Sequence, residues 1–180
     1  MNATIELEQE YGIQKHLLTT ISSVETGRWD AATKQNVAWP WTVNAQGKGH
    51  FYATKQQAIN AVKRLKAQGV KSIDVGCMQI NLAYHPDAFE NLEEAFNPYK
   101  NVEYGAKFLS KLYEQKGNWN KAATAYHSNA PIKAKKYAKK LFKMTFLCYN
   151  NIEFINNKGH LKGDKMKKEL KKYIKENSIL

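Results

Sequence analysis

The sequence contains few cysteines, few arginines and no long apolar run. Cys77 and Cys148 are the only two cysteines among 180 residues, too few for a disulfide framework, and the sequence does not decide whether they pair. No run of 18 or more apolar residues occurs, which excludes a membrane-spanning helix. The first residues are acidic and lack the basic and apolar regions of a secretory signal, so we expect no signal peptide here.

Arginine occurs only at Arg28 and Arg64, although the net charge is +12. Residues 1–131 carry 14 Lys and Arg against 12 Asp and Glu, about +2, whereas residues 132–180 carry 14 Lys against 4 acids, about +10. Binding of nucleic acid needs Lys and Arg clusters interleaved with aromatic residues on a folded surface. The nearly neutral front part does not fit that pattern, so we expect no nucleic-acid partner.

The chain does contain enough apolar material for a folded domain. Apolar residues make up 43% and aromatic residues 12%, which excludes general disorder. Ile13, Leu17, Ile21 and Val24 lie three or four positions apart, which predicts a helix over residues 12–25.

Further helices are predicted downstream. Thr54 and Gln57 form a capping box that opens one helix, and Pro98 opens another that Gly117 closes. Apolar spacing typical of a helix then continues as far as Pro131.

Strands are predicted between these helices. Residues 37–44 and 50–52 suit a hairpin, with Pro40 restricting it to a sheet edge. Residues 70–80 alternate and bend at Gly76, which predicts a strand or extended loop. The expected fold class is therefore α+β, mostly helical with a small antiparallel sheet or hairpin.

Two regions are expected along the chain. Residues 1–131 form the folded domain, and residues 132–180 form a Lys-rich C-terminal helical extension or tail. Within the extension, residues 132–143 suit a helix or arm, and residues 164–177 suit an amphipathic helix.

Glu25 is the first candidate for chemistry, because the predicted helix ends there, in Glu25-Thr26-Gly27. The negative end of the helix dipole and apolar neighbours both favour the protonated carboxyl, which is the form that a general acid needs. An exposed glutamate at a helix end is the commoner use of this residue type. The position alone therefore does not establish a catalytic role.

A second polar cluster lies in Ser72-Ile73-Asp74-Val75-Gly76-Cys77-Met78-Gln79-Ile80-Asn81. Its carboxylate, Asp74, is either held ionised by polar neighbours or is a turn aspartate that bonds its own backbone. Gln79 and Asn81 alternate with Ile80, which predicts that both amides face one side while Ile80 packs inward. Two carboxylates in different surroundings, with amides that bind hydroxyl and acetamido groups, are what cleavage of a glycosidic bond requires.

Together these elements resemble a known family. Glu25-Thr26-Gly27, the Ser72-to-Asn81 element and Ala125-Tyr126-His127-Ser128 occur in the order found in lysozyme-like lytic transglycosylases. The stretch Trp39-Pro40-Trp41-Thr42-Val43-Asn44 looks like the bacterial cell-envelope branch of that family. The Ser-x-Asp-x-Gly spacing is shared with muralytic enzymes of secretion and conjugation machines and with animal-type lysozyme.

The resemblance implies a lysozyme-like catalytic domain over residues 1–131 and a mechanism. In the family one glutamate protonates the oxygen between N-acetylmuramic acid and N-acetylglucosamine, then takes the proton of the muramic 6-hydroxyl. That hydroxyl attacks its own anomeric carbon and gives a 1,6-anhydro sugar without consuming water. This role falls on Glu25. Asp74, Met78, Gln79 and Asn81 match positions at the substrate, and Tyr126 matches the tyrosine that orients the acid.

Three departures leave alternatives open. His127 and Asn129 replace the Asn and Gly of the common Ala-Tyr-Asn-x-Gly pattern, so His127 is either a sugar contact or a packed histidine. Cys77 replaces an aliphatic residue, and a buried, inert thiol is expected. Asp74 is absent from many transglycosylases, so a lysozyme-type hydrolase that uses Glu25 and Asp74 remains an alternative. A catalytically idle peptidoglycan-binding assembly component is a third.

Partners and place follow from the same resemblance. We expect peptidoglycan glycan strands as the substrate and the periplasm or cell envelope of a bacterium as the location, with a secretion or conjugation machine as a candidate partner. The Lys-rich extension either contacts anionic envelope surfaces or is a solvated tail. No phosphate loop, triad or metal motif appears, so no cofactor and no metal is expected.

Five aromatic residues are candidate stacking platforms for a glycan: Trp29, Trp39, Trp41, Tyr84 and Tyr104. Aromatic residues more often fill cores, so we expect each to be buried and assign none of them to the site.

Overall fold

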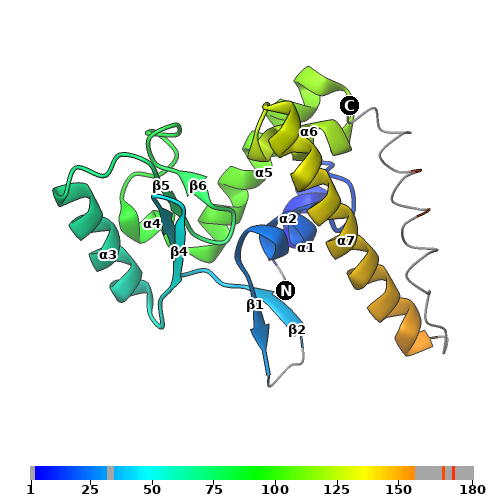
Figure 1. Ribbon diagram of the computed structural model, residues 1–180, viewed down its shortest axis with the longest axis horizontal. Coiled ribbons are helices and arrows are strands. Elements are labelled where there is room, and N and C mark those ends of the chain that lie inside the picture. The colour runs from blue at the N-terminus through cyan, green and yellow to red at the C-terminus, as the bar shows by residue number, and fades with distance from the viewer. Residues whose placement is uncertain (1–2, 32–34, 157–167, 169–171, 173–180) are drawn as a thin grey trace. The chain divides into compact units, whose positions relative to one another are not determined.

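The computed structural model describes residues 3–31, 35–156, 168 and 172 (Figure 1). The chain divides into two compact units, Met1–Lys107 and Phe108–Leu180. The helices are α1 (Ala3–Glu10), α2 (Leu17–Thr26), α3 (Lys55–Ala67), α4 (Leu92–Ala95), α5 (Pro98–Lys116), α6 (Trp119–His127) and α7 (Pro131–Asn156). The strands are β1 (Gly27–Asp30), β2 (Gln35–Ala38), β3 (Thr42–Ala45), β4 (Lys48–Phe51), β5 (Ile73–Val75) and β6 (Ile80–Asn81).

A four-stranded antiparallel sheet, in the order β4-β3-β5-β6, organises the first unit. Val43, Val75 and Ile80 lie opposite one another on one face and are almost fully buried. Val43 and Val75 belong to a core that α3 and α4 complete, together with Ala58, Ile59, Val62, Ile73, Ala95 and Phe96. The register places Asn44, Asp74 and Asn81 in a row on the other face. The sheet therefore separates an apolar face from a face of amides and one carboxyl.

The first long helix starts later than predicted. Glu8, buried in α1, accepts hydrogen bonds from the backbone N–H groups of His16 (2.7 Å), Leu18 (2.8 Å) and Thr19 (3.3 Å). A carboxylate there satisfies unpaired donors at the positive end of the helix dipole. The helix predicted over residues 12–25 therefore begins only at Leu17, after a turn.

The predicted hairpin is correct only in its second half. β3 and β4 pair through a two-residue turn at Gln46 and Gly47, both with positive φ, as a tight hairpin requires. Residues 37–38, however, belong to β2, which pairs with β1 in a separate two-stranded ribbon (Figure 1). Pro40 lies between β2 and β3, where its missing N–H removes no bond of the sheet.

Other local predictions are confirmed. Thr54 caps α3 by accepting a bond from the backbone N–H of Gln57 at 3.3 Å. Pro98 is the first residue of α5, and Gly117, with φ of 64°, follows the end of that helix. The helix cap and the two helix boundaries are set by residues close together in the sequence, so they can be predicted from the sequence alone.

The second unit contains α6 and α7, which pack against each other. The Lys-rich residues 132–143 lie in α7, where Tyr137, Ala138 and Leu141 are buried, so this segment is a packed helix. The helix predicted over residues 164–177 lies almost wholly outside the described residues. The boundary at residue 131 stays a prediction.

The described residues agree with the predicted α+β class, being mainly helical with small antiparallel sheets. Among them, no helix combines the length and apolar composition needed to cross a membrane.

Candidate functional site

Glu25 lies in the last turn of α2, as predicted, and is partly buried. Its Oε1 atom is inaccessible to solvent. The next residue, Thr26, is buried, and its hydroxyl lies 3.1 Å from the backbone oxygens of both Ser22 and Cys77. The contact to Cys77 O joins the end of α2 to the turn that follows β5. Two motifs about fifty positions apart are thus brought together in the first unit.

Gly27 is required by close packing. A Cβ atom there would lie 2.6 Å from the side-chain nitrogen of Asn36 and closer still to Ser23 O. Any larger residue would displace β2 or the end of α2, and with it Glu25. The Glu25-Thr26-Gly27 element is therefore a structural unit as well as a sequence motif.

Asn101, on α5, holds the turn between β5 and β6. Its buried side chain accepts a hydrogen bond from Met78 N (2.9 Å) and donates to Val75 O (3.1 Å) and Ala95 O (3.0 Å). Gly76 has φ of 77°, and an added Cβ would lie within 2.6 Å of Asn101 Oδ1. Sequence reasoning missed Asn101, because nothing near it in the sequence signals a partner more than twenty positions away.

Met78 was expected at the substrate, but its side chain has no exposed surface. It packs against Gly105 of α5, where an added Cβ would lie 2.8 Å from the Met78 methyl carbon. A fully buried side chain does not reach a ligand unless the turn moves. We therefore assign Met78 a packing role beneath the turn rather than contact with a sugar.

Gln79 closes the turn in a left-handed conformation, with φ of 49°. Such a conformation is uncommon for a residue other than glycine, and it occurs in turns and at active sites. The side-chain nitrogen donates to Gly76 O at 3.0 Å, which ties the two ends of the turn together. Gln79 lies in the turn and not on a strand, although Ile80 packs inward as predicted.

Asp74 and Asn81 are cross-strand partners on the polar face of the sheet. Asn81 Nδ2 donates to Asp74 Oδ1 (2.7 Å) and to Ser72 Oγ (2.9 Å), and Asn81 Oδ1 accepts from the backbone of Ala83 and Tyr84. Burial raises the pKa of Asp74, and the bond from Asn81 partly opposes that shift. Burial therefore has a larger effect on the pKa of Asp74 than its polar neighbour Asn81 has, and the choice between the two interpretations of Asp74 stays open.

This shift predicts a pH dependence of stability. The folded chain holds the Asp74 proton more tightly than the unfolded chain, so the free energy of unfolding should fall as pH rises from 3.8 to the raised pKa. Asp74→Asn should remove this component while still offering Asn81 an acceptor. Asn81→Ala should steepen it, because the opposing hydrogen bond is lost. Urea denaturation across this pH interval measures both slopes, and an Asp74→Asn profile identical to the parent's would contradict the shift.

Tyr126 and His127 lie near the end of α6, in the second unit. The Tyr126 ring packs 5.3 Å from that of Phe108, and its predicted role beside the catalytic acid stays a prediction. The His127 ring is stacked parallel to Tyr137 of α7, 4.3 Å away. Burial, followed by the charges of Lys140 and Lys133, lowers the pKa of His127. Of the two interpretations of His127, this geometry favours the packed histidine.

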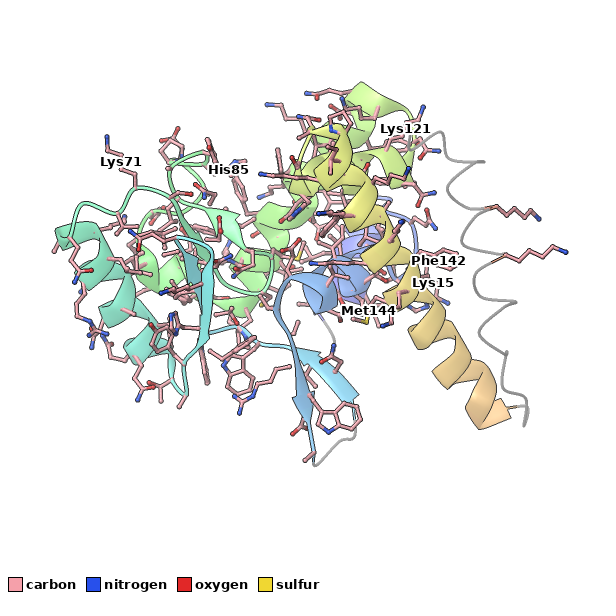
Figure 2. All side chains as sticks on the ribbon, viewed as in Figure 1. Lys15, Lys71, His85, Lys121, Phe142 and Met144 are labelled. Carbon is pink, nitrogen blue, oxygen red and sulfur yellow. The ribbon has the colours of Figure 1, made fainter. Side chains whose placement is uncertain are left out.

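The five candidate aromatic residues divide into two groups. Trp39, Trp41 and Tyr104 are partly buried, with the first two in edge-to-face contact. Tyr104 OH lies 3.0 Å from Nδ1 of His85, and His85 is labelled in Figure 2. Trp29 and Tyr84, by contrast, are 64% and 81% exposed, so the expectation of burial was wrong for both.

Cys77 lies in the turn that follows β5. Cys77 is free and buried, and burial raises its pKa to about 11, as suits the inert thiol that was expected. Among the described residues, no group of three or more His, Cys, Asp or Glu side chains is arranged to hold a metal ion.

Comparison with known proteins identifies the family. The family model named transglycosylase SLT domain matches residues 2–147, most of the chain. Searches of curated proteins and of solved structures each found no match. The matched region contains Glu25, the turn built on Gly76 and the sheet face with Asp74 and Asn81. The resemblance inferred from the sequence is therefore confirmed: the chain belongs to the SLT family of lysozyme-like lytic transglycosylases, which act on peptidoglycan.

Proposed function

We propose that this protein is a peptidoglycan lytic transglycosylase that uses Glu25 as its single acid and base. Glu25 donates its proton to the glycosidic oxygen between N-acetylmuramic acid and N-acetylglucosamine, and the bond from that oxygen to the muramic anomeric carbon breaks. The Glu25 carboxylate then takes the proton of the muramic 6-hydroxyl. The 6-oxygen bonds to the anomeric carbon, so a 1,6-anhydro sugar forms, Glu25 is protonated again and no water is consumed.

One observation carries the proposal: the Thr26 hydroxyl lies 3.1 Å from Cys77 O, which fixes the helix end with Glu25 against the turn that presents Gln79. An acid that acts twice on one sugar must be held still relative to the groups that position that sugar. The solvent-inaccessible Oε1 of Glu25 supports the same role, because loss of water favours the protonated form of a carboxyl, which is the form that a general acid needs.

The other candidate residues have supporting roles in this proposal. The amide of Gln79 contacts the sugar from the strained turn, and Asn81 orders the loop that begins at Ala83. Tyr126 orients Glu25, as the family resemblance implies. Asp74 is a positioning residue, because its Oδ1 accepts the Asn81 hydrogen bond.

The experiment is mass spectrometry of the fragments that the protein releases from purified peptidoglycan sacculi. We expect fragments lighter by one water than reducing fragments, and we expect Asp74→Asn to keep this product with a loss of activity below about tenfold. A hydrolase needs its second carboxylate as nucleophile or base. Reducing products, lost on Asp74→Asn, would replace the proposal by the lysozyme-type alternative, and no release at all would favour the idle binding component.

The proposed location is the periplasm or cell envelope of a bacterium, where peptidoglycan lies. Exposed lysines on α7 supply a face for anionic envelope polymers: Lys133, Lys136, Lys140 and Lys143. They follow one another at helical spacing of three or four residues, so they share a side of the helix. A secretion or conjugation machine remains a candidate partner.

This face predicts a salt-dependent contact. Changing its four lysines to glutamine should weaken binding to whole sacculi and flatten the salt dependence of that binding, because exposed charges attract over about 10 Å at 0.1 M salt. Truncation before α7 is a poor substitute, since Tyr137 and Leu141 are buried. Pull-down with sacculi at increasing salt measures the effect. If the variant keeps the salt dependence of the parent, the four lysines do not contribute to binding of sacculi and are only solvated.

A further inference from the structure

A cavity of about 420 Å³ lies in the first unit, and Cys77 is the residue that the turn carrying Gln79 contributes to its lining. Its walls come from α1, α2, β2, the following loop and the first turns of α5. Its lining is Ala3, Thr4, Thr19, Ser22, Ser23, Asn36, Val37, Ala38, Pro40, Cys77, Pro98 and Val102. None of these side chains is charged at neutral pH, and five carry a hydroxyl or an amide. The cavity size is that of a small-molecule site.

The cavity and Glu25 use different sides of α2. Thr19, Ser22 and Ser23 line the cavity, and at 100° per residue these positions fall on one side of the helix. Glu25 points about 110° away from the middle of that side by the same geometry. Glu25 is not a lining residue, although Ser22, its neighbour three positions earlier, is; a ligand in the cavity therefore lies beside the place in which Glu25 acts and does not need its carboxyl.

An exposed indole lies next to the cavity. Trp29 and Asn36 are direct partners across the β1–β2 ribbon, so their side chains lie on the same face of it. Asn36 lines the cavity, and Trp29 is 64% exposed. The ribbon therefore presents a flat aromatic surface beside a neutral, hydroxyl-lined hollow.

This combination selects for one class of ligand. A phosphate or a carboxylate would lose its hydration on entering the cavity, and hydroxyl and amide groups without a cation do not compensate for that loss. The hydroxyls of Thr4, Thr19 and Ser22 already form hydrogen bonds within the protein. A purely apolar ligand would take water from the other two polar side chains, the Ser23 hydroxyl and the Asn36 amide. An uncharged sugar satisfies both conditions, because its hydroxyl and acetamido groups pair with neutral donors and acceptors while its C–H face covers an aromatic ring.

We propose that the cavity bounded by Asn36 and α2, together with Trp29, is a second saccharide-binding site that takes an N-acetylhexosamine unit. That the unit comes from a peptidoglycan strand rests on the proposed function, whereas the preference for an uncharged sugar rests on the cavity lining and Trp29. A second site lets the protein hold a strand apart from the bond it cleaves. Because Cys77 lines the cavity and Cys77 O contacts the Thr26 hydroxyl, the two sites share one turn.

The test is an NMR titration of ¹⁵N-labelled Glu25→Gln protein with N,N′-diacetylchitobiose, a disaccharide of N-acetylglucosamine. We expect saturable shifts of the Trp29 indole N–H, the Asn36 side-chain amide and the Ser23 backbone amide. Trp29→Ala should weaken the binding read from Asn36 and Ser23 by about threefold to tenfold. It should leave the fold intact, since the indole is largely exposed.

Tyr84→Ala is the matched control, because Tyr84 is an equally prominent aromatic outside the cavity lining. It should leave the shifts at Asn36 and Ser23 unchanged. Shifts confined to Gln79 and Asn81, or no shift at the cavity residues, would overturn the proposal. An affinity that Trp29→Ala does not alter would do the same. The readout is binding to a protein that lacks Glu25, so its result does not depend on whether the native protein forms anhydro products.

Discussion

Glu25→Gln should lower the rate of release of peptidoglycan fragments by about 100-fold to 10,000-fold. The substitution keeps the volume of the side chain and its place at the end of α2, but it removes the proton that the leaving oxygen needs. The same change removes the base for the 6-hydroxyl, so both halves of the reaction are lost. Release of soluble fragments from purified sacculi measures the rate. Activity above about a tenth of the parent's would remove Glu25 from the catalytic role.

Glu8→Gln is the matched control, since Glu8 is a second carboxylate bound to the same helix. It accepts three backbone hydrogen bonds at the other end of α2. Its loss should lower the free energy of unfolding by roughly 2 kcal/mol and leave the activity of the folded protein near that of the parent. Glu25→Gln should show the reverse pattern. Loss of activity in both variants would indicate that the assay reports folding rather than chemistry.

The sequence predicts those features that depend on neighbouring residues. The cap of α3 at Thr54, the start of α5 at Pro98 and the inward position of Ile80 are each set within a few positions of the chain. Glu25 is in the same class, because the end of an apolar helix stripe and the glycine two residues later are visible in the sequence.

Contacts between distant segments account for what the sequence does not predict. Glu8 delays the start of α2 from eight to eleven positions away, and Asn101 holds Gly76 from twenty-five positions away. The burial of Met78 depends on Gly105 leaving room for its side chain. The exposure of Trp29 follows from the pairing of β1 with β2, whereas the hairpin pattern had assigned residues 37–38 to another partner.

These distant contacts shape the candidate site itself. The chain specifies Glu25 and the turn residues by local pattern, but it places them together through Thr26 with Cys77 and through Asn101 with Met78. The site residues are therefore held in place by buried side chains that are not themselves expected to contact a sugar. A substitution there should damage the site without touching any residue that contacts a sugar.

Gly76→Ala should be among the most destabilising single changes in the chain. With φ of 77°, Gly76 has a left-handed conformation that costs alanine about 1–2 kcal/mol. An added Cβ would also overlap the side chain of Asn101, which is fully buried and held by three hydrogen bonds. Moving Asn101 leaves buried backbone groups unpaired, at about 1–3 kcal/mol each. The total loss should exceed about 3 kcal/mol, with loss of activity as the turn shifts.

Gly69→Ala separates the two causes, because Gly69 has nearly the same φ, 78°, but nothing within 4 Å of an added Cβ. It should lose only the conformational part, about 1–2 kcal/mol, and keep full activity. Urea denaturation with linear extrapolation gives both free energies of unfolding. The difference between the two variants measures how firmly Asn101 holds the turn. Equal losses of unfolding free energy would show that the Asn101 side chain moves aside at no cost. The shape of the turn would then be set by the backbone conformations of Gly76 and Gln79 alone.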